Sequence, residues 1–186
     1  GIERGVEAGD VHALLLRLED RTAIRMGSLI DRQAEVKAYG LTTLQAEHVV
    51  IKGNRIIFDF IAKKGVPAHY EIEDGVLAGF LRARKAGKSS GEMLFPDVTA
   101  KSLNNYLQRL ARGRHYTLKD FRTFFGTSIA REALREYVHK RLSIAERRRV
   151  VRKVSTLVAE FLHNTPAVAR SAYINPMVWE VIGGLP

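Results

Sequence analysis

The residues from His48 to Ile72 change hydrophobic period, and this change narrows the folds that the chain can adopt. The segment HVVIK, then Gly53-Asn54, then RIIFDFIA predicts two strands joined by a tight turn. Lys63-Lys64-Gly65 predicts a second turn, and His69–Ile72 a third strand. The second strand alternates as a sheet with one buried face requires, with a core side that carries Ile56, Phe58 and Phe60. We therefore expect a small three-stranded antiparallel sheet over about 46–72.

Helical spacing of apolar residues dominates the rest of the chain. Capping residues mark several of the expected starts, because their side chains accept hydrogen bonds from the first backbone N–H groups of a helix. We expect helices after Asp10, after Asp74, over Ser102–Leu110, from Thr117 to about Tyr137, and over about Ser143–Leu162. The fold class is therefore mainly α with a small sheet (α+β). With 186 residues, of which 46% are hydrophobic, we expect one domain over 1–186.

The segment Phe161–Pro176 joins the last long helix to a short one that ends near a single tyrosine, Tyr173. Thr165 is suited to cap the short helix, and Pro166 to its first position, where a missing N–H costs nothing. A phenol with a pKa near 10 is a poor nucleophile unless cations surround it. Whether Tyr173 is chemically useful therefore depends on which cations the fold brings near it.

Arg122 is one candidate, because it lies within an apolar helical stripe rather than opposite it. The other members of that stripe are Leu118, Phe125, Ile129 and Ala133. A buried guanidinium is costly unless it is paired or binds an anion, so the alternative is a buried ion pair. Lys119 lies about one turn before Arg122, where the two could flank one phosphate.

Two further cations have ordinary explanations as well as functional ones. If the first helix persists, Arg25 lies on its apolar stripe, seven residues beyond the last apolar position. Otherwise Arg25 is a solvated arginine at a fraying helix end. Lys63 lies at the tip of a hairpin, where most lysines are simply solvated. A rigid turn would nevertheless let this lysine reach across a groove.

The balance of charge indicates a polyanionic partner. Thirty Lys and Arg against twenty Asp and Glu give a net charge of +10. The excess is greatest over Lys140–Lys153, where Arg147, Arg148 and Arg152 lie on the outer face of the expected helix. Such a face is often only solvated, but the overall charge favours contact with a nucleic-acid backbone.

Several other classes of site are disfavoured. No cysteine is present, which excludes disulfides and fits a reducing, cytoplasmic compartment. The histidines lack metal-ligand spacing, so we expect no metal. Gly87-Lys88-Ser89 resembles the end of a P-loop, but Arg82 stands where its first glycine is required, so we expect no nucleotide cofactor. No apolar run is long enough to span a membrane.

Five segments together resemble a known family. They are RTAIRMG at 21–27, GLTTLQAEHV at 40–49, FDFIAKKG at 58–65, KDFRTFFGT at 119–127 and NTPAVARSAYINP at 164–176. In this order they resemble the type IB DNA topoisomerases of the bacterial and poxvirus-like group, over about residues 13–178. The resemblance implies a catalytic core like that shared by these enzymes and the tyrosine recombinases.

The resemblance also implies roles for individual residues. Tyr173 matches the nucleophile, Arg25 and Arg122 the two phosphate-binding arginines, Lys63 the general acid, and Asn164 the third phosphate-binding group. Lys119, Lys64, Arg147, Arg148 and Arg152 are the residues that we expect to bind DNA. The implied reaction relaxes supercoiled double-stranded DNA through a 3′-phosphotyrosyl intermediate, without ATP or metal, and we expect a monomer, nucleoid-associated if the source is bacterial.

The chain departs from the family pattern at three positions. Asp31 stands where a tyrosine is common, Gln45 where an arginine is usual, and His163 where a glycine is usual. We also expect the family's small N-terminal clamp domain to be absent, which predicts weak, distributive, salt-sensitive relaxation.

Two other functions remain open. The first is the catalytic domain of a tyrosine recombinase or integrase, although these enzymes typically carry H-x-x-R where this chain has Lys119-Asp-Phe-Arg122. The second is a DNA-binding module without catalysis.

Overall fold

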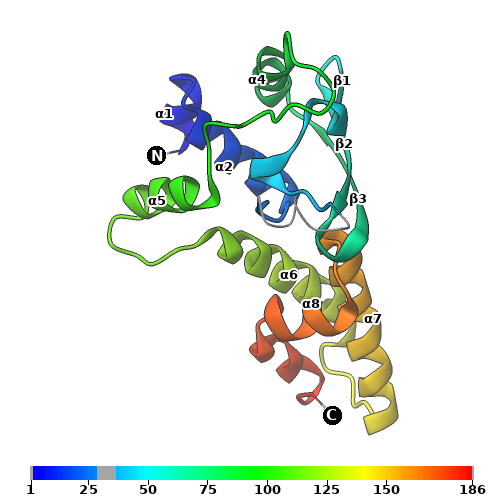
Figure 1. The fold of residues 1–186 in the computed structure, drawn as a ribbon. Coiled ribbons are helices and arrows are strands. Elements are labelled where there is room, and N and C mark those ends of the chain that lie inside the picture. The colour runs from blue at the N-terminus through cyan, green and yellow to red at the C-terminus, as the bar shows by residue number, and fades with distance from the viewer. Residues whose placement is uncertain (1, 29–36, 186) are drawn as a thin grey trace. The chain divides into compact units, whose positions relative to one another are not determined.

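The computed structural model describes residues 2–28 and 37–185, and its elements are shown in Figure 1. The helices are α1 (Ile2–Glu7), α2 (Val11–Thr22), α4 (Gly75–Lys85), α5 (Ala100–Leu110), α6 (Leu118–Leu134), α7 (Ile144–Leu162) and α8 (Pro166–Ala172). The strands are β1 (Val49–Lys52), β2 (Arg55–Ala62) and β3 (Val66–Glu73). Short 3₁₀ helices span Leu41–Thr43, Ala46–His48, Lys63–Gly65, Arg135–Tyr137 and Pro176–Ile182. The chain divides into two compact units, Gly1–Leu118 and Lys119–Pro186, called here the first and second units.

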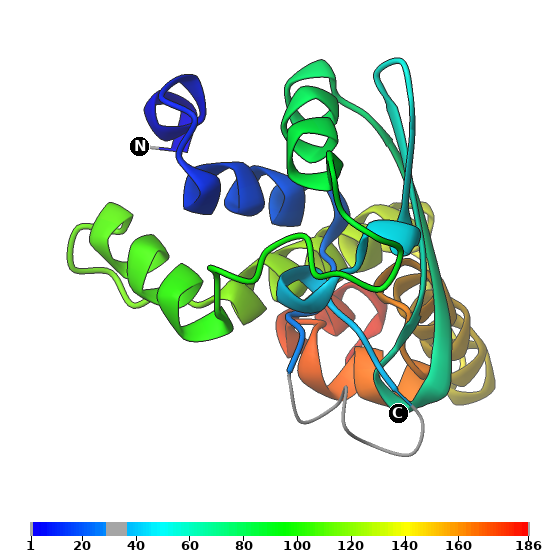
Figure 2. The same ribbon diagram turned by 45° about the horizontal axis from the view of Figure 1, so that its top comes forward.

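The first unit contains the antiparallel sheet, in the order β1-β2-β3. Ile56, Phe58 and Phe60 are buried on its core side, as their alternation predicts. Strand β3 begins earlier than the expected His69, because Val66 pairs with Ala62 and Pro67 with Ile61. A proline is tolerated there because β3 lies at the edge of the sheet. Figures 1 and 2 show α4 beside the β1–β2 hairpin.

Helix α2 supplies a large part of the core of the first unit and ends sooner than expected. Asp10 caps it by accepting hydrogen bonds from the N–H groups of His12 (2.8 Å) and Ala13 (3.4 Å). The helix stops at Thr22, because Ala23 adopts the left-handed conformation with φ of 50°. The helix does not persist to Arg25, so Arg25 lies beyond its apolar stripe.

A buried ion pair joins α2 to α4. One oxygen of Asp74 accepts from the N–H groups of Val76 and Leu77 and so caps α4, and the other accepts from Nε of Arg17 at 2.8 Å. The Asp74 side chain is 2% exposed. Burial alone would raise the pKa of this carboxyl, but the hydrogen bonds from Arg17 and the backbone outweigh burial and hold the pKa below its ordinary value.

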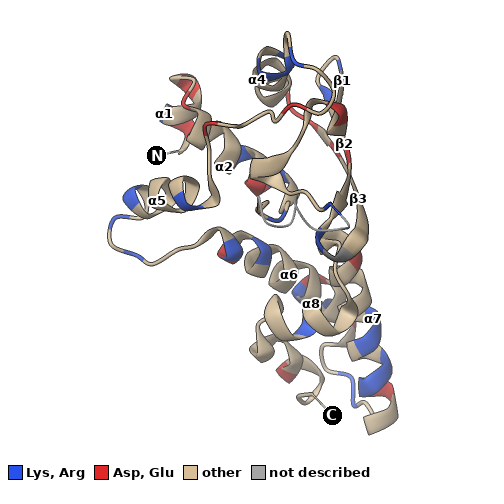
Figure 3. Cartoon of the chain, viewed as in Figure 1, with Lys and Arg blue, Asp and Glu red and all other residues tan. Residues whose placement is uncertain are grey.

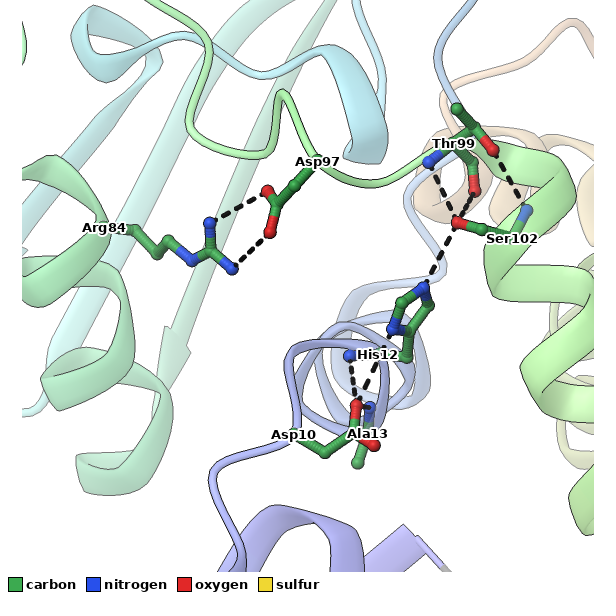
Figure 4. Close-up of polar contacts among 7 residues, drawn as sticks. All are labelled: Asp10, His12, Ala13, Arg84, Asp97, Thr99 and Ser102. Carbon is green, nitrogen blue, oxygen red and sulfur yellow. Dashed lines mark hydrogen bonds and ion pairs between the residues drawn. The ribbon is translucent and has the colours of Figure 1, made fainter.

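A second polar cluster lies around α5, and Figure 4 shows its members. Ser102 and Thr99 form a capping box at the start of α5, and Nε2 of His12 lies 3.2 Å from the Ser102 hydroxyl. Arg84 donates two hydrogen bonds of 2.9 Å to the carboxylate of Asp97. These contacts join α2 to α5, and α4 to the loop before α5, over long distances in sequence.

In the second unit, α7 packs against α8. Ser143 caps α7 through a capping box with Glu146. Thr165 caps α8 with Pro166 in its first turn, as the sequence predicts. Helix α6 ends at Leu134 and is followed by the 3₁₀ helix Arg135–Tyr137. The two units together agree with the expected fold class, mostly helical with a small antiparallel sheet. None of the helices in the described ranges has the length and hydropathy that a membrane crossing requires.

Candidate active site

Arg25 is positioned by two segments of the first unit that approach each other closely. The carbonyl of Arg25 accepts a hydrogen bond from the N–H of Leu41 at 2.9 Å. A Cβ at Gly40 would lie 2.3 Å from that carbonyl oxygen, and a Cβ at Gly27 would lie 2.0 Å from the Thr43 hydroxyl. Glycine is required at Gly40, because the added Cβ would overlap backbone atoms of the other segment, and at Gly27 the Cβ would overlap the Thr43 side chain. The half-buried Arg25 is therefore held by the contact between the RTAIRMG and GLTTLQAEHV segments.

Lys63 lies in the turn between β2 and β3, as predicted. It begins the 3₁₀ helix Lys63–Gly65, and it is exposed. Gly65 completes the turn with φ of 72°, a conformation that favours glycine. The paired strands on both sides give Lys63 a rigid base. Lys64 belongs to the same turn, but its side chain lies outside what the structure describes.

Arg122 lies on the buried side of α6 in the second unit and is 3% exposed. Its Nη2 donates to the carbonyl oxygen of Leu162, at the end of α7, over 2.7 Å. The buried stripe of α6 differs from the predicted one, since Phe125, Ile129 and Ala133 are only half-buried. The fully buried positions are Leu118, Arg122, Gly126, Ala130 and Leu134, which recur every four residues. The burial of Arg122 itself agrees with the prediction.

Asn164 meets Arg122 at the same carbonyl group. Its Nδ2 lies 3.4 Å from the Leu162 oxygen, and its backbone N–H donates to Ala159 at 2.9 Å. His163 precedes it in the left-handed conformation, with φ of 48°, and terminates α7. That backbone conformation gives a physical reason why a glycine would be usual at this position. The end of α7 therefore brings an arginine and an amide together.

Tyr173 follows α8 and packs against the cations of α6. The Cζ of Arg122 lies 4.9 Å from the centroid of the Tyr173 ring, and Nζ of Lys119 lies 5.8 Å from it. The tyrosine is 7% exposed. Within the second unit, Tyr173, Arg122, Asn164 and Lys119 thus form one cluster, although the sequence alone left open whether the tyrosine is held in place.

Two residues of α6 that sequence reasoning did not select fix the backbone of this tyrosine. A Cβ at Gly126 would lie 2.6 Å from the carbonyl oxygen of Tyr173. The hydroxyl of Thr127 donates to the same oxygen at 3.4 Å and accepts from the N–H of Asn175 at 3.1 Å. The sequence signal that could have found them is a glycine followed by a hydroxyl residue within the KDFRTFFGT segment. Gly126 and Thr127 therefore position Tyr173.

The three selected arginines of α7 differ in their contacts. Arg147 donates to the carbonyl oxygens of Gly183 (2.8 Å) and Leu142 (3.3 Å), so it holds the C-terminal segment against α7. Arg148 and Arg152 are exposed and make no hydrogen bond or ion pair with the described part of the chain. Figure 3 shows the Lys and Arg residues gathered along α7.

One group in the first unit superficially resembles a hydrolase triad. Asp10, His12 and Ser102 follow one another, with 3.7 Å between Asp10 and the His12 ring and 3.2 Å between that ring and Ser102 (Figure 4). The Ser102 hydroxyl, however, accepts from the N–H of Thr99 and lies 3.0 Å from its carbonyl oxygen. Asp10 likewise caps α2. These groups hold helix ends, and no nucleophile is free among them.

No cluster of three or more His, Asp or Glu within 2–28 and 37–185 has the arrangement of a metal site. Asp31, the acid found where a tyrosine is common, lies outside the described residues. Gln45, found where an arginine is usual, is buried and donates to the carbonyl oxygen of Gly91 at 2.6 Å. The amide at position 45 therefore holds a loop of the first unit.

The chain matches a sequence model of a protein family. That family is the catalytic core of eukaryotic DNA topoisomerase I, matched over residues 2–177. The chain belongs to this family. The match includes all five of the segments that carry the resemblance, in both units.

Known members of the topoisomerase family resemble the chain at moderate identity. DNA topoisomerase 1 of Schizosaccharomyces pombe is 27% identical over 157 residues, which are 83% of this chain and 19% of that protein. DNA topoisomerase 1 of Candidozyma auris is 37% identical over 93 residues, 48% of this chain and 12% of that protein. DNA topoisomerase 1B of Acanthamoeba polyphaga mimivirus is 25% identical over 180 residues, 88% of this chain and 52% of that protein. The chain thus spans about half or less of the length of each relative.

Proposed function

We propose that the chain is the catalytic part of a type IB DNA topoisomerase and relaxes supercoiled DNA by transient cleavage of one strand. The observation that carries this proposal is the cluster in the second unit. A buried arginine and an amide meet at the carbonyl of Leu162, and Tyr173 packs on that arginine. Family membership supports the same reaction.

The chemistry requires these groups. The Tyr173 phenol loses its proton and its oxygen attacks a DNA phosphorus, forming the 3′-phosphotyrosyl bond while the bond to the 5′ oxygen breaks. The transition state gains negative charge on the non-bridging oxygens, which forked guanidinium donors stabilise. We assign that role to Arg122 and Arg25, with the Asn164 amide as a neutral donor.

Lys63 is proposed as the general acid that protonates the departing 5′ oxygen. Its place in a rigid, exposed turn supports this assignment. The covalent intermediate conserves the energy of the phosphodiester bond, so rotation and religation require neither ATP nor a metal ion.

Lys119, Lys64, Arg147, Arg148 and Arg152 are proposed to bind the DNA backbone, and the net charge of +10 supports a polyanionic substrate. We further propose a monomer that acts in the cytoplasm, since one chain carries all five proposed catalytic residues and no cysteine. The bacterial and poxvirus-like group is our finer proposal. The five segments that carry the family resemblance support it.

Relaxation of negatively supercoiled plasmid in the presence of EDTA tests the function. We expect relaxation without dependence on a particular site, falling steeply as salt rises. Sequence-specific joining of DNA would instead identify a tyrosine recombinase, and a mobility shift without nicking would identify a DNA-binding module. Processive relaxation at high salt would contradict the distributive behaviour that we expect.

The role of Lys63 has a separate test. Lys63→Ala should slow cleavage of an ordinary phosphodiester, and a 5′-phosphorothiolate should restore the rate because its leaving group needs no proton. Arg55→Ala is the control, since this exposed residue of β2 pairs with Glu71 and has no proposed catalytic role. A Lys63→Ala variant that stays slow on the phosphorothiolate would assign Lys63 to structure, and Lys64 would then be tested.

A further inference from the structure

The second unit contains a pocket of about 530 Å³ that the proposed reaction at Tyr173 does not use. It lies between α7 and α8, and the segment after α8 contributes Leu185 to its wall. Arginines 148 and 152 of α7, four residues apart, face it together with Arg170 of α8. None of the described lining residues is acidic. The pocket therefore gathers positive charge beside a partly apolar wall.

The arginines of this pocket are not used to hold the fold together. Arg148, Arg152 and Arg170 make no hydrogen bond or ion pair with any part of the chain that the structure describes. Neighbouring cations of the same unit behave differently, since Lys153 pairs with Glu136 at 3.0 Å and Arg147 holds Gly183. The three positive charges repel one another, and the described lining of the pocket contains no acid to neutralise them. Such a site is suited to an anion.

Ser155 supplies a second, independent observation. It lies in the lining of the same pocket and is 3% exposed, yet its Oγ has no hydrogen-bond partner among the described residues. Buried hydroxyl groups are normally satisfied, because leaving one unpaired costs free energy. The Oγ itself is closed to solvent, so a phosphate oxygen in the pocket accepts a hydrogen bond from it once the Ser155 side chain rotates toward the guanidinium groups.

We propose that this pocket binds a phosphate group through Arg148, Arg152, Arg170 and the Ser155 hydroxyl. The group is either a phosphodiester of bound DNA or a free phosphate compound, since both offer the same charged oxygens. The DNA arm rests on the proposed function, in which Arg148 and Arg152 already contact the DNA backbone, and adds Arg170 and Ser155 to that contact. The free-phosphate arm goes beyond the proposed function, because binding here needs no reaction at Tyr173. Arg170 is three residues before Tyr173, so an occupied pocket also holds α8 against α7 next to the tyrosine.

The test uses the full chain and two probes. The variant is Arg152→Gln combined with Arg170→Gln, and the matched control is Arg149→Gln, an exposed arginine of α7 outside the pocket. Calorimetry with inorganic pyrophosphate measures the free-phosphate arm. Fluorescence anisotropy with a linear DNA duplex at several salt concentrations measures the DNA arm, and neither probe depends on catalysis.

If the pocket takes a free phosphate compound, the double variant binds pyrophosphate at least tenfold more weakly than the control while its DNA affinity matches the control. If it takes a DNA phosphate, duplex affinity falls at least tenfold below the control and the salt slope drops by about 0.9 for each lost contact. A double variant equal to Arg149→Gln with both probes overturns the proposal.

A second variant, Ser155→Ala, tests the pocket in a protein whose folding the substitution should not impair. Removing an unpaired buried hydroxyl should leave the melting temperature unchanged or raise it. The same variant should weaken the binding of whichever probe the pocket takes by about threefold to tenfold. An unchanged affinity for both probes would exclude the hydroxyl from the site.

Discussion

The two units use their charged residues in different ways. Gly1–Leu118 holds eighteen Lys and Arg with fourteen Asp and Glu, whereas Lys119–Pro186 holds twelve with six. In the first unit, Arg17 is bound by Asp74 and Arg84 by Asp97, so guanidinium groups join helices and loops. In the second unit the buried Arg122 contacts a carbonyl and a tyrosine ring, and three further arginines face one pocket.

The difference separates charge that stabilises the fold from charge that is available to a ligand. An acid placed within reach of a guanidinium satisfies it and fixes a helix. A guanidinium that faces a pocket with no acid in its described lining keeps its positive field, and that field is what a phosphodiester requires. The net charge of the whole chain does not distinguish the charges that stabilise the fold from those that are available to a ligand.

The largest effect is expected from breaking the ion pair between Asp74 and Arg17 in the first unit. Asp74→Ala should lower the free energy of unfolding by about 3 kcal/mol, because it leaves Arg17 without its main partner and removes the cap of α4. Asp97→Ala is the control and should cost less than about 1 kcal/mol, since its side chain is 50% exposed. Urea unfolding monitored by circular dichroism measures both. Equal losses would show that burial of the pair does not matter.

The same ion pair predicts a pH dependence. The folded-state pKa of Asp74 lies below its ordinary value of 3.8, so the unfolded chain binds the proton more tightly. The stabilisation is therefore complete above about pH 4 and is lost as pH falls through the folded-state pKa. Urea midpoints measured between pH 3 and pH 6 should draw closer together for wild type and Asp74→Ala as the pH falls below about 4. Parallel curves would contradict this assignment.

Two glycines inside helices, one in each unit, make a sharper comparison. Gly126→Ala should reduce relaxation about a hundredfold, because the new Cβ displaces the backbone of Tyr173. Gly79→Ala, in α4, meets nothing within 4 Å and should stabilise the protein by about 0.5–1 kcal/mol without changing activity. Plasmid relaxation and thermal unfolding measure the pair. A fully active Gly126→Ala variant would remove α6 from the positioning of the tyrosine.

A smaller effect is expected at Thr127. Thr127→Val keeps the shape but loses the hydrogen bonds to Tyr173 and Asn175, so relaxation should fall about tenfold and stability by about 1 kcal/mol. Ser128→Ala, the exposed neighbour on α6, is the control. If the Thr127 hydroxyl positions Tyr173, Thr127→Ser should relax DNA faster than Thr127→Val and close to the wild-type rate. A Thr127→Ser variant as slow as Thr127→Val would show that the methyl group of Thr127 matters through packing instead.

The smallest effect concerns the end of α7, next to Asn164. His163→Gly should be more stable than His163→Ala by about 1 kcal/mol, because both remove the ring and only glycine adopts positive φ freely. Thermal unfolding of the two variants measures the difference. Equal stability would mean that position 163 leaves the left-handed conformation when its ring is removed.

The sequence predicted features that depend on neighbouring residues. Asp10, Asp74 and Thr165 cap helices where expected, because a cap acts on the next turn of the chain. The burial of Arg122 followed from its place within an apolar stripe. The fold class followed from the change of period at the hairpin.

Features that depend on distant contacts were missed. The end of α2 at Thr22 has no local signal, since alanine at position 23 normally continues a helix. The fit of Gly126 against the Tyr173 backbone joins residues far apart in sequence, and nothing near Gly126 predicts it. The sequence predicted that Arg148 and Arg152 face outward and bind DNA, but nothing near them predicts that Arg170 of α8 lines the same pocket.

The most direct test of the account is covalent capture of DNA by Tyr173. A duplex labelled on the strand to be cut, mixed with the protein and quenched with detergent, should give a protein–DNA adduct with wild type. Tyr173→Phe should give none while binding DNA within about twofold of wild type, because only one hydroxyl is lost. An adduct of normal yield with Tyr173→Phe would contradict the account and direct attention to Tyr137 and Tyr116.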